Sequence, residues 1–150
     1  MNTTRIALTT ALLAAGAWTA KAVAIGIAGG LDRSPFENPL FFLGLAAWMV
    51  ALAASGAALT RGAPTPVRIA ASLGAVAAGW VAVVLVGALV GDRVAGHWAW
   101  TELNLWVAGA LTLGLAFWLD RRVETADHRK ELPDRQTVIA DRRKEAAARW

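Results

Sequence analysis

The distribution of charge along the chain is the feature that most constrains its fold. Of the 26 Lys, Arg, Asp and Glu residues among 150, 16 lie from Asp120 onward, whereas positions 6–119 contain only nine. A soluble domain of this size needs a far more polar surface than those 114 positions can provide. The sequence therefore predicts a membrane-embedded domain over 1–119 and a charged, helical cytoplasmic tail over 120–150.

Four segments of the first domain are apolar enough to cross a bilayer. A spanning helix needs about 20 mostly apolar residues to cover roughly 30 Å of hydrocarbon. Short connections between such helices favour antiparallel neighbours. We expect an all-α membrane protein, a four-transmembrane-helix up-and-down bundle, with spans at about 6–30, 39–60, 67–91 and 100–119.

Several residues predict where the helices begin and end. Asn38 and Thr65 each precede a proline, which is typical of an N-cap followed by the first helical residue. Gly30 and Gly62 stand where a left-handed residue would end a helix. The segment 34–37 also resembles a capping box, but a helix beginning there would carry a proline at its fifth residue, so we expect a short turn at 35–38 that leads into the second span.

Basic residues in the short connections predict the orientation. Arg5, Arg61 and Arg68 fall on the same side as nine basic tail residues, against Arg33 and Arg93 on the other. Because Lys and Arg resist translocation, the more basic side faces the cytoplasm. The expected location is the plasma (inner) membrane, with both termini in the cytoplasm.

The N-terminal run has an alternative interpretation. Arg5, an apolar stretch and Ala20-Lys21-Ala22 resemble a signal peptide with its cleavage site. The apolar run nevertheless continues past Lys21 for nine more residues to Gly30, which a cleaved signal does not need. Retention of the segment as the first span is the preferred interpretation.

Lys21 is the most informative residue of the spans. It lies near the middle of the first span, where a lysine costs on the order of 2.5 to 3.5 kcal/mol and should face protein or water. The side chains three, four and seven positions away are mostly small, and Trp18 could receive the ammonium over its ring. This face comprises Ala14, Ala17, Trp18, Ala24 and Ala28.

A partner for Lys21 within the chain is hard to identify. Glu102 is the nearest candidate, but in antiparallel helices each side chain leans toward its own N-terminus, which would point the two groups apart. We therefore expect a neutral or hydrated lysine, or an anionic group supplied by something else.

Glu102 has two further interpretations. Together with Asn104, and with Asp92 and His97 nearby, it could contribute to a weak metal or proton site at the outer face. Alternatively, Thr101 caps the fourth helix, Glu102 favours the positive end of that helix, and both remain at the wet interface.

The tail also has two interpretations. Opposite charges recur at helical spacing, and Pro133 separates two helical stretches. The tail is then either a solvated, charge-paired helix or a helix that docks on the inner leaflet or a partner. The docking candidates are Arg142, Arg143, Lys144 and Trp150.

Small residues recur every fourth position in the third apolar segment and predict close helix packing in a compact bundle or oligomer. One series is Ala70, Gly74, Ala78 and Ala82, and the other is Ala71, Ala75 and Gly79.

The sequence lacks the residues or motifs that several functions require. The chain has no cysteine, which excludes disulfides and thiolate metal sites. The tail has nearly balanced charges without interleaved aromatic residues, so nucleic-acid binding is not expected. No phosphate-binding loop, nucleophile elbow or zinc spacing occurs. We therefore expect no catalytic, cofactor or metal site and no enzyme activity.

Two functional hypotheses remain. The first is a non-catalytic accessory or structural subunit of a membrane complex, in which Lys21 and the tail contact another membrane protein. The alternative is a small oligomeric transporter or channel that uses Lys21 for an anionic or carboxylate substrate. The expected partners are the lipid bilayer and either another membrane protein or further copies of the chain.

Overall fold

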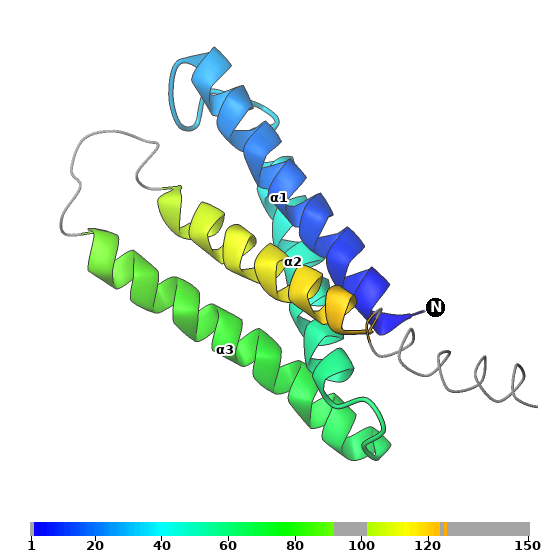
Figure 1. Ribbon diagram of the computed structural model, residues 1–150. Helices are drawn as coiled ribbons and strands as arrows, with labels where there is room; N and C mark the ends of the chain where they lie inside the picture. The colour runs from blue at the N-terminus through cyan, green and yellow to red at the C-terminus, as the bar shows by residue number, and fades with distance from the viewer. Residues whose placement is uncertain (1, 92–101, 124, 126–150) are drawn as a thin grey trace, which may run out of the picture. The chain divides into compact units, whose positions relative to one another are not determined.

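The computed structural model describes residues 2–91, 102–123 and 125, and these form long helices (Figure 1). The helices are α1 (Thr3–Ala28), α2 (Glu37–Leu59), α3 (Thr65–Gly91) and a fourth helix, Leu103–Val123. Each is long and apolar enough to cross a membrane, which confirms the prediction of four such helices. The chain divides into two units, Met1–Leu119 and Asp120–Trp150, and the first contains α1, α2, α3 and most of the fourth helix.

The end of α1 is a glycine-dependent cap. Gly29 has a φ of 78°, and its N–H donates to the carbonyl of Gly26, while Gly30 N–H donates to that of Ile25. These two bonds define a Schellman motif, in which the left-handed residue carries no steric penalty only when it lacks a Cβ. The left-handed cap is thus Gly29, one residue before the predicted Gly30.

The two internal helix starts also differ from the prediction. α2 begins at Glu37 with Phe36 at the N-cap, so Asn38 lies inside the helix. Starting there leaves Pro39 in the first turn, where its missing N–H costs nothing. α3 begins at Thr65, and the carbonyl of Pro64 accepts the first bonds of the helix. The predicted caps were therefore wrong by one or two residues.

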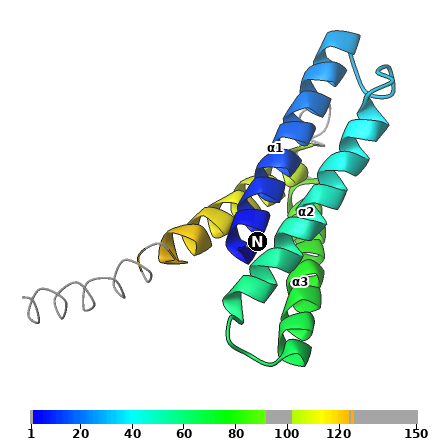
Figure 2. The same cartoon turned by 90° about the vertical axis from the view of Figure 1, so that its right-hand side faces the viewer.

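Successive helices of the first unit run in opposite directions (Figures 1 and 2). α1 packs along α2, and α3 packs along the other side of α2. At the end where the chain begins, the guanidinium of Arg61 donates to Asn2 Oδ1 and to the hydroxyls of Thr3 and Thr4. These bonds connect the α2–α3 turn to the start of α1.

The core lies among α1, α2 and the fourth helix. One cluster is built around Trp18 and Trp48, and the other consists of alanines. The small side chains let the helices approach closely, as expected where association depends on packing. The second cluster contains Ala7, Ala11, Ala51 and Ala116.

The two small-residue series of α3 have different environments. Ala71 approaches α2 so closely that a Cβ at Gly56 would lie 2.4 Å from the Ala71 carbonyl oxygen. Gly79 of α3 faces Leu52 and Trp48 of α2. The other series is exposed, and a Cβ at Gly74 would meet no atom within 4 Å. The exposed series consists of Ala70, Gly74, Ala78 and Ala82.

Candidate ligand cavity around Lys21

Lys21 lies on the buried face of α1. The helix midpoint falls between Ala15 and Gly16, so Lys21 is about 8 Å from it along the axis at 1.5 Å per residue. Only 5% of the lysine is exposed. Its buried neighbours one turn away are Ala17, Trp18 and Ile25, whereas Ala24 and Ala28 are half-buried. The expectation that Lys21 faces protein is therefore met.

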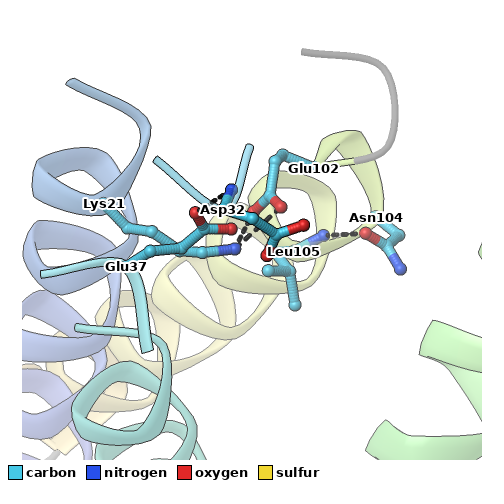
Figure 3. A network of polar contacts seen from close by, with 6 residues as sticks. All are labelled: Lys21, Asp32, Glu37, Glu102, Asn104 and Leu105. Atoms are coloured by element: carbon cyan, nitrogen blue, oxygen red, sulfur yellow. Dashed lines mark hydrogen bonds and ion pairs between the residues drawn. The ribbon is translucent and has the colours of Figure 1, made fainter. Parts of the chain in front are cut away.

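The ammonium of Lys21 is paired with Glu102 at the start of the fourth helix (Figure 3). Lys21 Nζ donates to Oε1 at 2.7 Å and to Oε2 at 2.8 Å. Glu102 is itself only 8% exposed. Both charges are thus removed from solvent together and neutralise each other, which is the condition under which buried ions are tolerated.

The expectation that helix geometry points Lys21 and Glu102 apart is wrong, because Glu102 is not within the regular helix. The fourth helix begins at Leu103, and the Glu102 carbonyl accepts bonds from the N–H groups of Leu105 and Trp106. Glu102 therefore occupies the N-cap position, where side-chain direction is not fixed by helical geometry. The flexible four-carbon stem of lysine covers the remaining distance. The expectation that Glu102 stays at a wet interface is also wrong.

An aromatic ring adds a second contact to the ammonium. Lys21 Nζ lies 5.3 Å from the centre of the Phe41 ring, within the range of a cation–π interaction. Phe41 belongs to α2, so the lysine connects three helices. In the described part of the chain, the ammonium of Lys21 therefore lies over the ring of Phe41. The prediction had named the ring of Trp18.

Trp18 has a packing role instead. Its indole lies between α2 and the fourth helix, where a Cβ at Gly44 would be 2.3 Å from Nε1 and one at Gly109 would be 3.4 Å from the ring. Among the described residues, Nε1 has no hydrogen-bond partner. The nearby Trp48 Nε1 does have one, since it donates to Thr112 Oγ1 at 2.8 Å.

The α1–α2 connection is anchored beside this pair by a second buried carboxylate. Glu37 Oε2 accepts a hydrogen bond of 2.9 Å from the N–H of Asp32, which has a φ of 59°. Glu37 is 8% exposed, and Figure 3 shows both glutamates among the residues around Lys21. The anchoring role of Glu37 could not be predicted from the sequence, because it depends on the path of the connection.

A cavity of about 310 Å³ opens beside the ion pair. This volume is at the lower end of the range of about 300–1,000 Å³ found for small-molecule sites. Its walls come from all four helices, and Lys21 and Glu102 are the ionisable groups among them. The other lining residues are Trp18, Phe41, Leu45, Trp48, Trp80, Val83, Asn104 and Leu105.

Asn104 supplies a further polar group at the cavity. Its Oδ1 accepts from the N–H of Leu105 at 2.9 Å. An amide at the wall of a mostly apolar and aromatic cavity can orient a ligand by one or two hydrogen bonds. The site therefore combines paired charges, one amide and several aromatic rings.

The remaining predicted site residues lie outside the described part of the chain. These are Asp92 and His97 of the weak outer-face site, Thr101, and the docking candidates Arg142, Arg143, Lys144 and Trp150. Within residues 2–91, 102–123 and 125, no group of three His, Cys, Asp or Glu side chains could hold a metal ion.

The chain matches no protein-family model, no curated protein and no solved structure. The cavity and the residues around it are therefore the basis for inferring its function.

Proposed function

We propose that the protein is a small membrane transporter whose substrate site is the cavity beside Lys21 and Glu102. The observation that carries this proposal is a cavity lined by a buried ion pair in a wall otherwise formed mainly by apolar and aromatic side chains. Mostly apolar cavities with a few convergent polar groups are typical of small-molecule sites. Ionisable residues within membrane spans are typical of substrate and ion pathways.

The internal pairing of Lys21 is what favours this function over that of an accessory subunit. An unpaired lysine in a span would call for an anionic group from another protein. Glu102 already supplies the carboxylate, at 2.7 Å. The pair can instead respond to a ligand that enters the cavity, as a substrate site must.

On the predicted orientation, with both termini in the cytoplasm, the ion pair lies toward the outer side of the plasma (inner) membrane. Basic residues near the opposite end, including Arg5, Arg61 and Arg68, support this orientation. A ligand would then reach the cavity from outside the cell.

An accessory or oligomeric role is the second candidate, and α3 is the feature that favours it. Its exposed series Ala70, Gly74, Ala78 and Ala82 offers a row of small residues along which another helix could pack closely. The mass and composition of the particle extracted in mild detergent test this role. Stoichiometric recovery with a different polypeptide would support an accessory subunit, whereas recovery alone or with copies of itself would favour the transporter.

Ligand-induced stabilisation tests the transporter proposal. Purified protein is screened against small metabolites, charged and aromatic ones included, for an increase in melting temperature, and each active compound is retested on two variants. Val83→Phe fills the cavity from α3, whereas the matched control Val84→Phe adds the same bulk to the neighbouring position, which is 65% exposed.

We expect compounds that stabilise the natural protein and Val84→Phe but not Val83→Phe, and flux of those compounds into liposomes that contain the protein. The proposal fails if no compound stabilises the protein, or if stabilisation survives Val83→Phe. It also fails if the bound compounds never cross the liposome membrane.

A further inference from the structure

The net charge of the cavity wall restricts the kind of ligand that it can hold. Among the described lining residues, Lys21 and Glu102 are the only ionisable groups, and they form one ion pair with no net charge. Both are more than nine-tenths buried. Removing the partner of a buried charge is strongly unfavourable, because the other charge is left without compensation.

A ligand with a single charge would create that situation. A cation that takes Glu102 leaves the ammonium of Lys21 unpaired, and an anion that takes Lys21 leaves the carboxylate of Glu102 unpaired. A ligand with both charges avoids this cost, because its carboxylate can pair with Lys21 while its ammonium pairs with Glu102. The single ion pair becomes two, and the site remains neutral.

The rest of the cavity determines the body of the ligand. Trp48 and Trp80 lie with ring centres 5.8 Å apart, and Trp18 and Phe41 form further parts of the wall. Such surfaces favour an apolar or aromatic body, and rings also attract an ammonium over their faces. The half-buried Asn104 offers an amide to the polar end.

We infer that the ligand is a small zwitterion with adjacent amine and carboxylate groups on an apolar or aromatic body, of the size of an aromatic amino acid. This inference rests on the proposed use of the cavity as a substrate site. The ligand replaces the Lys21–Glu102 contact with two contacts of its own, and the flexible stem of Lys21 provides the required movement.

Three compounds with the same ring separate the charge classes. Phenylalanine carries both charges, 2-phenylethylamine carries only the positive one, and 3-phenylpropanoate carries only the negative one. Their affinities for the full-length protein in detergent are measured by calorimetry at neutral pH. We expect phenylalanine to bind at least about tenfold more tightly than either of the others.

Variants of the pair should reverse this preference. Lys21→Met leaves Glu102 without its partner and should favour 2-phenylethylamine over phenylalanine, whereas Glu102→Gln should favour 3-phenylpropanoate. If a variant does not fold, the affinities of the three compounds for the natural protein still test whether the ligand is a zwitterion.

Equal or tighter binding of a singly charged compound by the natural protein overturns the inference, as does the absence of binding by phenylalanine. Either result leaves the transporter proposal to be decided by Val83→Phe, since a ligand of another class could still depend on the cavity. Loss of phenylalanine binding in Val83→Phe, with retention in Val84→Phe, would support both the substrate site and the zwitterionic ligand.

Discussion

Three polar side chains in the core of this protein are stabilised by specific partners. Lys21 bonds to Glu102, Glu37 accepts from the backbone of Asp32, and Trp48 donates to Thr112. The first and third bonds join residues far apart in the chain, whereas the second is local to the α1–α2 connection and the start of α2. A buried polar group that loses its partner lowers the free energy of unfolding by more than the hydrogen bond itself contributes. These positions should therefore be sensitive to isosteric substitution.

Thr112→Val tests this at the residue scale. Valine has nearly the same shape as threonine but cannot accept from Trp48 Nε1, and Trp48 is only 2% exposed. We expect the free energy of unfolding in detergent to fall by about 1–3 kcal/mol. The control is Thr19→Val, because Thr19 is exposed and bonds only to a carbonyl of its own helix. Equal effects of the two substitutions would contradict the assigned role of Thr112.

At the scale of the helices, close approach is governed by a few glycines. The rigid indole of Trp18 is inserted between Gly44 on α2 and Gly109 on the fourth helix. A Cβ at Gly44 would overlap the edge of the indole, so the rigid ring would have to shift to make room for it. Packed interfaces of this kind tolerate added methyl groups poorly.

Gly44→Ala is therefore expected to lower the free energy of unfolding by about 1–3 kcal/mol. Gly16→Ala is the matched control, because a Cβ there would meet no atom within 4 Å and alanine favours a helix over glycine. Thermal unfolding of both variants in the same detergent measures the difference. A neutral Gly44→Ala would show that Trp18 does not pack against α2 as described.

The number and approximate limits of the helices were predictable from the sequence, because apolar length alone determines what can cross a bilayer. The ends were less predictable. Phe36 has no capping side chain, yet it precedes α2, because the fold of the α1–α2 connection decides where that helix begins. Local capping preferences were overridden by this tertiary arrangement.

The candidate site was predicted only in part. Lys21 was identified because a charge in an apolar run is conspicuous, and Glu102 was recognised as the nearest acid. Their pairing was missed because it depends on Glu102 preceding the helix. Phe41 and Glu37 could not be identified, since an aromatic residue and an acid near the start of an apolar helix have many ordinary explanations.

At the scale of the whole molecule, the two described connections between helices lie at opposite ends of the first unit (Figure 1). The α1–α2 connection and the α2–α3 turn lie at opposite ends of α2 (Figure 1). The excess of basic residues predicts that the end carrying Arg5 and Arg61 faces the cytoplasm.

Single cysteines test this orientation, because the natural chain has none. Leu31→Cys and Thr65→Cys place exposed thiols in the first connection and at the start of α3. An impermeant maleimide should label the first variant in intact cells and the second only after the membrane is permeabilised. The reverse pattern would invert the orientation and would place the cavity toward the cytoplasm.

The central claim is that Lys21 and Glu102 neutralise each other inside the protein, and a double-mutant cycle measures this directly. The free energy of unfolding is determined for the natural chain, Lys21→Met, Glu102→Gln and the double variant. We predict that each single substitution costs about 3 kcal/mol and that the double variant recovers about 2 kcal/mol relative to their sum. Effects that add to within about 0.5 kcal/mol would show that the two residues are not paired and would remove the basis of the proposed site.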